Sequence, residues 1–357
     1  MHEHALVIGK FYPPHKGHIY LIEQARKAAH RVTVLVYGSS YQSVPGSQRA
    51  QWIREAFTHK PGIHVKTLIN DMYEDYDSPE VWEAHDAILK AYLRNLKAAP
   101  VDLIVSSEPY GEEMAQKYFG GIDFLLVDQP RINVPISATK IRENLVKNWK
   151  FLPDSTKNGL IPRIVVVGAE STGTTTLSTA LSEHYNARWV WEAGRYYTFE
   201  KLAQVHVEDR NAGMEDMVWT EEDFAEIGRR QNVAEFQIAV SDKPQFPLLI
   251  SDTDAYATAV WEYRYIGTPI DDALRLPYAN NLPKRDLYII TDHEGVDFEQ
   301  DGIRDGQDTR EWMTRMFEDT LTQRGESWVK IRGDKETRLK IAITLIDKIL
   351  ETKYDFN

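Results

Sequence analysis

The chain has 357 residues, of which 42% are hydrophobic and 27% charged, with a net charge of -12 and no cysteine. This composition excludes disulfides, thiolate nucleophiles and cysteine-bound metals, and it differs from that of disordered or fibrous chains. The negative charge disfavours nonspecific binding to nucleic acid or anionic membranes, and the absence of a leader pattern and of a long apolar run predicts a cytoplasmic protein.

The first half of the chain alternates expected strands with expected helices. The pattern predicts strands near residues 5–8, 31–37, 63–69, 101–106 and 124–127, and helices near residues 19–29, 47–58, 79–96 and 111–119. Such alternation is typical of a parallel sheet with helices on both faces. We expect a binding site at the carboxyl ends of these strands, where the strand order reverses.

The turn after the first expected strand reads GKFYPPHKGH over residues 9–18. His15 and His18 lie three positions apart at the start of the next helix and therefore share one face. A helix N-terminus offers unpaired amides and the positive end of the helix dipole, and Lys16 adds a cation. Histidines in a helical turn are often plain surface residues, but this combination predicts a site for the triphosphate of a nucleotide.

A second segment, ISATKIREN over residues 136–144, carries hydroxyl and basic side chains. Ser137 is suited to cap a helix that begins after it, and Lys140 and Arg142 lie in the first turns of that helix. A capping serine alone would be unremarkable. Together with the histidine turn, the segment predicts a second set of phosphate contacts.

Residues 149–162 contain two prolines and several turn-forming residues, and they separate the expected domains at 1–155 and 160–357. The alternation then starts again. The pattern predicts strands near residues 163–167, 187–192, 248–253, 286–291 and 328–332, and helices near residues 174–185, 221–240 and 335–353. The second domain is therefore also expected to be α/β.

The segment RIVVVGAESTGTTT, residues 163–176, has the strand, the glycine spacing and the helix start of a phosphate-binding P-loop. Thr174 stands at the lysine position, so the loop lacks the fixed charge that normally contacts the β- and γ-phosphates. Backbone amides can still cradle phosphates there, and Thr175 can still meet Mg²⁺. The expected loop residues are Gly168, Ser171, Thr172, Gly173, Thr174, Thr175 and Thr176.

Two motifs of the first domain resemble a known superfamily. Residues 9–18 together with residues 136–142 look like the HxGH nucleotidyltransferases, which are adenylyl- and cytidylyltransferases with a Rossmann-like fold. Within that superfamily, residues 106–110 (SSEPY) and 133–153 resemble the adenylyltransferase half of bacterial NadR proteins. The resemblance implies that the acceptor is nicotinamide mononucleotide.

The resemblance also implies a reaction, in which the mononucleotide phosphate attacks the α-phosphorus of ATP to give NAD and pyrophosphate, with Mg²⁺ accompanying ATP. It implies that His15 and His18 donate to the phosphates and that Lys16 and Arg142 cover the leaving pyrophosphate. For the tryptophans among the expected mononucleotide contacts, core packing is the alternative. The other expected contacts are Gly9, Phe11, Tyr12, Ser137 and Thr139 for ATP, and Arg49, Trp52, Trp82 and Glu108 for the mononucleotide.

The second domain resembles the kinase half of NadR proteins, which phosphorylates nicotinamide riboside. The resemblance rests on the P-loop frame, on WEAGRY at residues 191–196, on SDTD at 251–254, and on DGIR at 301–304 followed by Arg310. It covers the chain from about residue 4 to about residue 350. It implies a Rossmann-like HxGH nucleotidyltransferase domain followed by a P-loop kinase-like α/β domain.

This second resemblance implies roles for several side chains. Glu192 or Asp252 would accept the proton of the riboside 5'-hydroxyl, and Thr175 with Asp252 would hold Mg²⁺. As alternatives, the aspartates could cap the following helix and the lid arginines could be solvated charges. The expected substrate and lid residues are Arg195, Asp254, Arg304 and Arg310.

Thr174 leaves two interpretations of the second domain. Either Arg304, Arg310 or Lys201 replaces the missing lysine and the domain is a working kinase, or the domain is a lapsed kinase that binds nucleotide. We favour the working kinase, because the rest of the phosphoryl-transfer set is present, whereas a decayed site tends to lose several parts.

Three further hypotheses concern DNA binding, the acceptor of the first domain and the oligomeric state. Some NadR relatives repress transcription through an N-terminal DNA-binding domain, but this chain begins at the first strand of the adenylyltransferase and we expect no such domain. The first domain could instead transfer adenylate to phosphopantetheine or cytidylate to a polyol phosphate, which the P-loop partner and the SSEPY segment disfavour. A homo-oligomer is compatible with the sequence.

Overall fold

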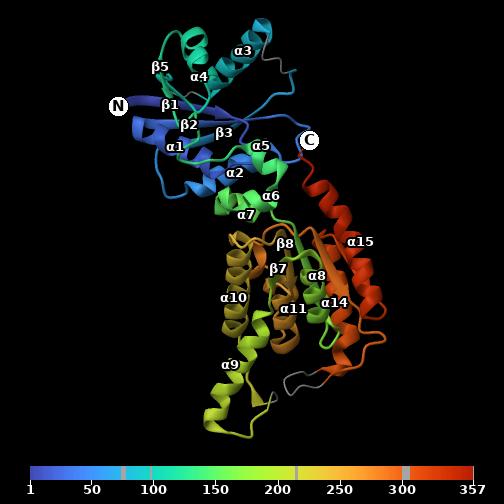
Figure 1. Cartoon of the computed structure of the whole chain (residues 1–357). Helices are drawn as coiled ribbons and strands as arrows, with labels where there is room; N and C mark the ends of the chain where they lie inside the picture. The colour runs from blue at the N-terminus through green and yellow to red at the C-terminus, as the bar shows by residue number, and fades with distance from the viewer. Residues whose placement is uncertain (74–77, 97–98, 214–215, 300–305, 357) are drawn as a thin grey trace. The chain divides into compact units, whose positions relative to one another are not determined.

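Two units divide the chain in the computed structural model, which describes residues 1–73, 78–96, 99–213, 216–299 and 306–356. The first unit contains Met1–Leu160 with Asp355–Asn357, and the second contains Ile161–Tyr354. The division between Leu160 and Ile161 falls within the segment 149–162 that separates the expected domains. Each unit is built around one five-stranded sheet (Figure 1).

The first sheet is parallel throughout, with the strand order β3-β2-β1-β4-β5. Chain order reverses beside β1, since β2 and β3 follow on one side and β4 and β5 on the other. The carboxyl end of β1 therefore opens at the point where such sheets bind ligands. The strands are β1 (His2–Gly9), β2 (Ala29–Gly38), β3 (Ile63–Ile69), β4 (Leu103–Ser106) and β5 (Asp123–Leu126).

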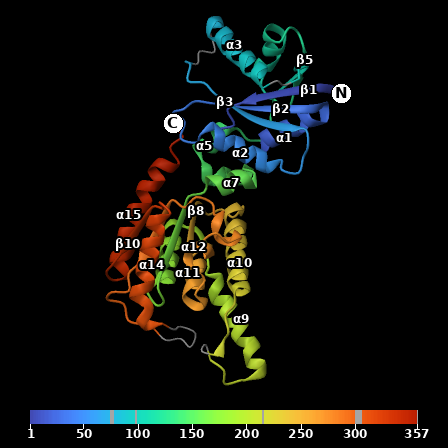
Figure 2. The same ribbon diagram turned by 180° about the vertical axis from the view of Figure 1, so that it is seen from behind.

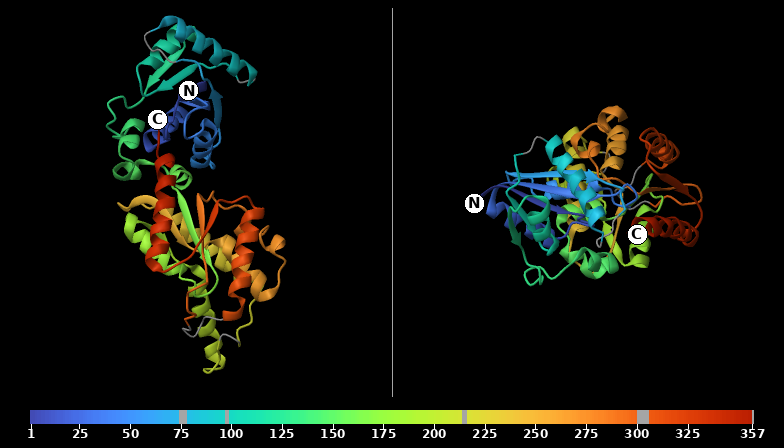
Figure 3. Two further views of the ribbon diagram at one scale, coloured as in Figure 1. Left: turned by 90° about the vertical axis from the view of Figure 1, so that its right-hand side faces the viewer. Right: turned by 90° about the horizontal axis from the view of Figure 1, so that it is seen from above.

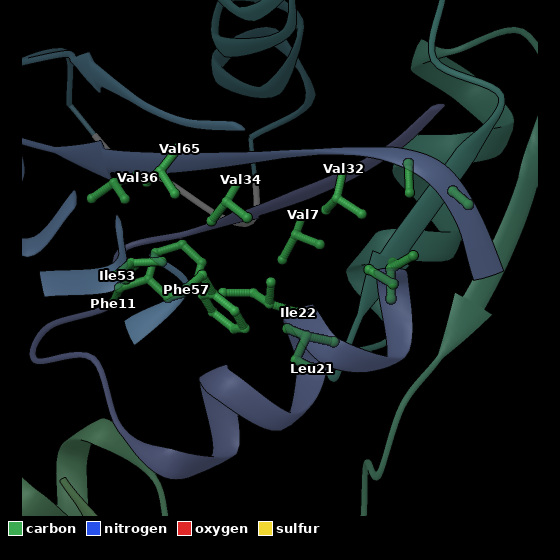
Figure 4. Close-up of a cluster of buried hydrophobic side chains, with 14 of the residues drawn as sticks. Val7, Phe11, Leu21, Ile22, Val32, Val34, Val36, Ile53, Phe57 and Val65 are labelled. Atoms are coloured by element: carbon green, nitrogen blue, oxygen red, sulfur yellow. The ribbon is translucent and has the colours of Figure 1, made fainter. Parts of the chain in front are cut away.

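Helices cover both faces of this sheet. On one face Val7 and Val34 point toward Leu21 and Ile22 of α1, in a buried apolar cluster that α2 also joins (Figure 4). The alternate side chains of the same strands, such as Leu6, pack on the other face against α3 and the π-helix η1. The helices are α1 (Lys16–Ala28), α2 (Gly46–Ala56), α3 (Pro79–Asn95), α4 (Tyr110–Glu113), η1 (Met114–Tyr118), α5 (Ala138–Glu143), α6 (Leu145–Asn148), the 3-10 helix η2 (Trp149–Phe151) and α7 (Asp154–Leu160).

The second sheet is also parallel and has the order β10-β9-β6-β8-β7. Its central strand β6 leads directly into the expected P-loop. The strands are β6 (Arg163–Gly168), β7 (Ala187–Val190), β8 (Phe246–Asp252), β9 (Leu287–Thr291) and β10 (Trp328–Ile331).

Helices again cover both faces of the second sheet (Figure 2; Figure 3). One buried cluster joins the strands to α8 and α15, and another joins them to α11, α13 and α14. The helices are α8 (Thr174–Tyr185), α9 (Ala193–Glu208), α10 (Glu221–Val240), α11 (Ala255–Ile266), α12 (Ile270–Ala273), α13 (Pro277–Asn280), the 3-10 helix η4 (Gln307–Thr309), α14 (Arg310–Gln323) and α15 (Lys335–Lys353).

The expected fold class, two parallel α/β sheets in series, is confirmed. Two long helices, α9 and α11, were not predicted. In α11 the run 255–260 is buried on successive residues, so no amphipathic period marks it, while α9 exposes the aromatic rings of Tyr196 and Phe199. Within the described ranges, no helix has both the length and the apolar character needed to cross a membrane.

Candidate active sites

The two histidines of the first unit are locked together at the start of α1. His15 is the N-cap of this helix, and its Nδ1 accepts a hydrogen bond from the backbone N–H of His18 at 3.3 Å. In return, the His15 backbone N–H donates to Nδ1 of His18 at 3.2 Å. The two rings are stacked with centroids 3.6 Å apart, and the edge of Phe11 holds His18 from a further side.

Both imidazoles are neutral at physiological pH. Burial and the nearby charge of Arg131 lower the pKa of His15 to about 3. Burial, His15 and Arg131 hold the pKa of His18 well below its ordinary value. Since each Nδ1 accepts a backbone hydrogen bond, the single proton of each neutral ring is on Nε2. The pair therefore offers two N–H donors without a positive charge.

Gly17 allows this arrangement, because a Cβ at this position would lie 2.9 Å from the Nδ1 and Cε1 atoms of His15. Any larger residue would displace the His15 ring. The motif thus requires glycine between the histidines for a steric reason that the sequence alone does not reveal.

A cavity of about 630 Å³ lies in front of the histidine pair, at the carboxyl end of β1. Arg142 is fixed at its wall, where its Nη1 donates to the Tyr12 carbonyl at 2.7 Å and its Nη2 reaches Thr139 Oγ1 at 3.4 Å. Ser137 caps α5 by accepting from the Lys140 amide. The expected residues that line this cavity are Gly9, Phe11, Tyr12, His15, His18, Glu108, Ser137, Thr139 and Arg142.

Three expected residues line neither this cavity nor the smaller one that adjoins it. The Lys16 ammonium donates to the Lys150 carbonyl at 2.6 Å. The Arg49 guanidinium is fully buried, where it donates to the Tyr37 carbonyl at 3.4 Å and to Gln42. The Trp52 side chain is buried beside Gly159 of α7. We do not include these three residues in the proposed site, because none of them faces the cavity.

A second cavity, of about 250 Å³, shares Ile8, Gly9, Lys10 and Tyr110 with the first. Its wall is aromatic, with the ring of Trp82 stacked on Tyr118 at 6.3 Å between centroids. This adjoining space suits a flat heteroaromatic ring. Trp82, unlike Trp52, therefore lines a cavity that adjoins the one in front of the histidines.

Arg131 is a wall residue of the larger cavity that the sequence did not suggest. Its Nη2 forms an ion pair of 2.7 Å with Glu108 Oε1, which lines the same cavity. The loop 128–134 that carries it contains no motif, although the backbone amides of residues 132–134 converge on the Asp128 carboxylate. No signal in the sequence distinguished Arg131 from a solvated surface charge.

The P-loop of the second unit has the geometry of an anion-binding nest. A Cβ on Gly168 would lie 2.4 Å from the Thr172 and Thr291 hydroxyl oxygens, so the loop requires glycine there. Gly173 is left-handed, with φ of 86°, and begins α8. The loop surrounds a cavity of about 140 Å³, which is lined by all the expected loop residues together with Glu192 and Arg195.

Asp252 lies behind this loop at the end of β8. Burial raises the pKa of its carboxyl group, although hydrogen bonds from Thr175 and Thr174 and the charge of Arg195 act in the opposite direction. Its contact with Thr175 agrees with the expected pairing of these two oxygen donors. Asp252 does not line the P-loop cavity or the aromatic cavity described below, which is lined by Trp219, Trp261 and other rings. Glu192 lines both of these cavities.

Three residues that the sequence predicts as lid, substrate contact or substitute cation do not line the P-loop cavity and bind other protein groups. The Arg310 guanidinium donates to the carbonyls of Ser171, Val296 and His293. Asp254 caps α11 and is buried against Arg285. Lys201 pairs with Asp223 at 2.8 Å. Arg304 lies outside the described residues.

An aromatic cavity of about 80 Å³ adjoins the P-loop cavity and was not predicted. Its rings are Trp219, Phe224, Trp261 and Tyr265, with Trp219 and Tyr265 5.4 Å apart between centroids. Glu192 and Arg195 line both cavities and so stand at their junction. The sequence carried one hint, since Trp261 and Tyr265 are four residues apart and share a helix face.

Comparisons with known proteins agree with this division of the chain. Residues 6–144 match a family described as cytidylyltransferase-like, and residues 163–338 match a family described as an AAA domain. Each match falls within one unit. The first match contains the histidine turn, and the second contains the P-loop.

The chain is also similar to larger proteins that combine both halves. It is 27% identical to the trifunctional NAD biosynthesis/regulator protein NadR of Salmonella typhimurium over 84% of this chain and 71% of that protein. It is 26% identical to the protein of the same description from Escherichia coli over 97% of this chain and 83% of that protein.

Two solved structures share the fold over nearly the whole chain. A crystal structure of NadR protein in complex with NAD and AMP-PNP matches with a TM-score of 0.53 and 21% identity, covering 98% of this chain and 96% of that one. A second, in complex with NR, matches with the same TM-score and identity and covers 97% and 96%.

Proposed function

Because the chain is homologous to the NadR proteins over most of its length, we propose that it carries out two consecutive steps of NAD biosynthesis. The second unit phosphorylates nicotinamide riboside, and the first unit transfers adenylate from ATP to the resulting nicotinamide mononucleotide. The product of one reaction is thus the substrate of the other.

In the adenylyl transfer, a phosphate oxygen of the mononucleotide attacks the α-phosphorus of ATP. A new P–O bond forms, the bond to the β-phosphate breaks, and pyrophosphate leaves. The Nε2–H groups of His15 and His18 donate to the phosphate oxygens, on which negative charge accumulates. Arg142 adds a cation at the cavity wall, where its anchoring to Tyr12 limits its movement.

The adjoining aromatic cavity supports nicotinamide mononucleotide as the acceptor. Its ring would stack on Trp82 within the smaller cavity, while its phosphate reaches the larger one across Gly9 and Lys10. Phosphopantetheine and polyol phosphates lack an aromatic ring at the corresponding end and would leave this cavity unused.

In the kinase half, the riboside would occupy the aromatic cavity beside the P-loop. Its 5'-hydroxyl would then lie near the junction, where Glu192 accepts the proton as the oxygen attacks the γ-phosphorus. Arg195 at the same junction orients the substrate. Glu192 is better placed for this role than Asp252, which faces neither cavity.

The second half also has oxygen donors that fit Mg²⁺. Thr175 and Asp252 form a hydroxyl–carboxylate pair behind the P-loop, and Mg²⁺ typically binds one or two such groups and completes its shell with phosphates and water. When bound, the ion would neutralise charge on the triphosphate. Thr175, which lines the P-loop cavity, would hold the ion directly, and Asp252, which accepts a hydrogen bond from Thr175, would hold it through a water molecule.

The stacked, neutral histidine pair that faces a two-part cavity is the observation that carries the adenylyltransferase assignment. We expect pyrophosphate release with nicotinamide mononucleotide that exceeds release with phosphopantetheine or polyol phosphates. His18→Ala should reduce this release by at least about 10²-fold, because it removes a phosphate donor. Arg26→Ala, an exposed change in the same helix, is the matched control. A fully active His18→Ala variant, or preference for another acceptor, would contradict the proposal.

A further inference from the structure

The P-loop cavity has few cations for a nucleotide triphosphate. Thr174 takes the place of the usual lysine, and four carboxylates line the cavity, those of Glu170, Glu192, Asp297 and Glu299. Among the described wall residues, the positively charged side chains are Arg195 and Lys335. Among the residues that the structure describes, these two groups are therefore the candidates to face the phosphates.

Two of the other cations considered from the sequence are engaged elsewhere, and the third, Arg304, lies outside the described residues. Lys201 is paired with Asp223, and the Arg310 guanidinium serves three backbone carbonyls. Neither side chain lines the P-loop cavity. Arg195 lines it but also lines the aromatic cavity, so its place is at the acceptor end.

Lys335 is held beside the P-loop by the helix that carries it. It is the first residue of α15, whose N-cap, Asp334, accepts from the Thr337 amide at 2.8 Å. One turn later the buried Arg338 donates from Nη1 to the Thr172 carbonyl of the loop, at 2.7 Å. Residues three apart share a helix face, so the face that carries Lys335 is the one fastened to the loop.

The Lys335 ammonium is not paired with any other residue that the structure describes. Within the residues that the structure describes, it takes part in no hydrogen bond or ion pair, and its side chain is exposed at the cavity wall. It lines the P-loop cavity and does not line the aromatic one. Its location is therefore on the nucleotide side of the junction.

We propose that Lys335 supplies the ammonium group that the P-loop lacks at Thr174. During transfer the bond between the 5'-oxygen and the γ-phosphorus forms, the bond from the γ-phosphorus to the β-phosphate breaks, and Glu192 takes the hydroxyl proton. Lys335 makes and breaks no covalent bond, but it neutralises charge that accumulates on the departing ADP. This inference rests on the proposed kinase activity.

The test introduces a lysine at position 174, where a P-loop usually has one. Riboside phosphorylation is measured for the wild type, Lys335→Ala, Lys335→Arg, Thr174→Lys and the double variant Lys335→Ala/Thr174→Lys. We expect Lys335→Ala to reduce kcat/KM for ATP by about 10²-fold, Lys335→Arg to retain most activity, and Thr174→Lys to restore activity lost in Lys335→Ala. Lys340→Ala, exposed on the same helix and paired with Glu336, should match the wild type. Adenylyl transfer by the first unit should be unchanged in every variant, and a wild-type circular dichroism spectrum and thermal unfolding curve show that the second unit is folded in each.

Full riboside phosphorylation by Lys335→Ala would overturn the inference. It would also be overturned if Thr174→Lys alone were active but the double variant phosphorylated the riboside no faster than Lys335→Ala. A wild type without riboside phosphorylation would instead refute the kinase proposal. In that case ATP binding to the second unit is measured by calorimetry with the first site saturated by NAD. Weaker binding of ATP, but not of adenosine, by Lys335→Ala would still support a phosphate contact, and equal binding of ATP would reject it.

Discussion

At the scale of single residues, the histidine turn of the first unit works through neutral donors. Nδ1 of each ring accepts a hydrogen bond from the backbone N–H of the other histidine. These two hydrogen bonds fix both tautomers and hold the rings in a stacked arrangement. A buried imidazolium pair would repel itself, and burial depresses both pKa values. Donation without charge is therefore the chemistry that this turn supplies.

We expect neither His15 nor His18 to titrate near pH 6.5 in the folded protein. The pKa of His15 is lowered to about 3 and that of His18 is lowered well below 6.5, so both rings stay neutral as the pH falls through 6.5. Since unfolded histidine protonates near pH 6.5, the folded state loses stability as the pH falls below that value. NMR of protein labelled with ¹³C-histidine, assigned with His15→Asn and His18→Asn, measures this. A midpoint between pH 6 and 7 for either ring would refute the assigned state.

Gly17→Ala tests the steric requirement between the histidines. The added methyl group would lie 2.9 Å from the His15 ring and would displace it. We expect adenylyl transfer to fall by about 10- to 10²-fold, because small displacements of a catalytic group are costly, while riboside phosphorylation is unchanged. Wild-type adenylyl transfer by Gly17→Ala would show that the ring position matters less than the geometry indicates.

At the scale of elements, the P-loop is fastened by two helices that follow it far along the chain. Arg310 of α14 donates to the Ser171 carbonyl and Arg338 of α15 donates to the Thr172 carbonyl. Both guanidinium groups are buried, and each also binds the backbone after β9. These arginines stabilise the loop that holds phosphate.

Arg310→Ala should therefore destabilise the second unit as well as weaken its activity. The change leaves carbonyl groups of the loop and of residues 293 and 296 without a donor, which costs about 2 to 3 kcal/mol. Denaturant unfolding measures this cost, and KM for ATP in riboside phosphorylation should rise. Arg315→Ala, a surface change in the same helix, is the control, and an equal effect of both changes would contradict a bracing role for Arg310.

The sequence predicted the sheets because their strands are short apolar runs separated by turn-forming residues. It also placed the histidine turn and the P-loop, since each is a continuous motif directly after a strand. It did not reveal the walls that come from distant elements, such as Arg131, Trp219 and Lys335. Each of these side chains has ordinary neighbours in sequence, and its place in a cavity depends on tertiary packing.

Burial explains why some side chains that we expected to contact a ligand do not line a cavity. Arg49 and Trp52 lie on the buried face of α2, and Asp254 is the cap of a helix that is itself buried. A sequence marks such residues as chemically able to bind a ligand. The sequence alone does not show whether these residues already bind backbone groups or are packed in the core.

At the scale of the whole molecule, each unit has its own cavity for the proposed ATP-dependent reaction. Each has a phosphate cavity joined to an aromatic cavity, although the two folds have different strand orders and different motifs. This shared plan suits two reactions whose substrates carry the same nicotinamide ring, with ATP as the common second substrate.

The most direct test of the account supplies nicotinamide riboside, ATP and Mg²⁺ to the full chain and follows the nucleotides formed. We expect the wild type to make NAD, His18→Ala to accumulate nicotinamide mononucleotide without NAD, and Glu192→Gln to make neither from the riboside while still making NAD from added mononucleotide. NAD formation by His18→Ala would contradict the two-step account. It would also be contradicted if the wild type made neither mononucleotide nor NAD from the riboside and His18→Ala made no mononucleotide.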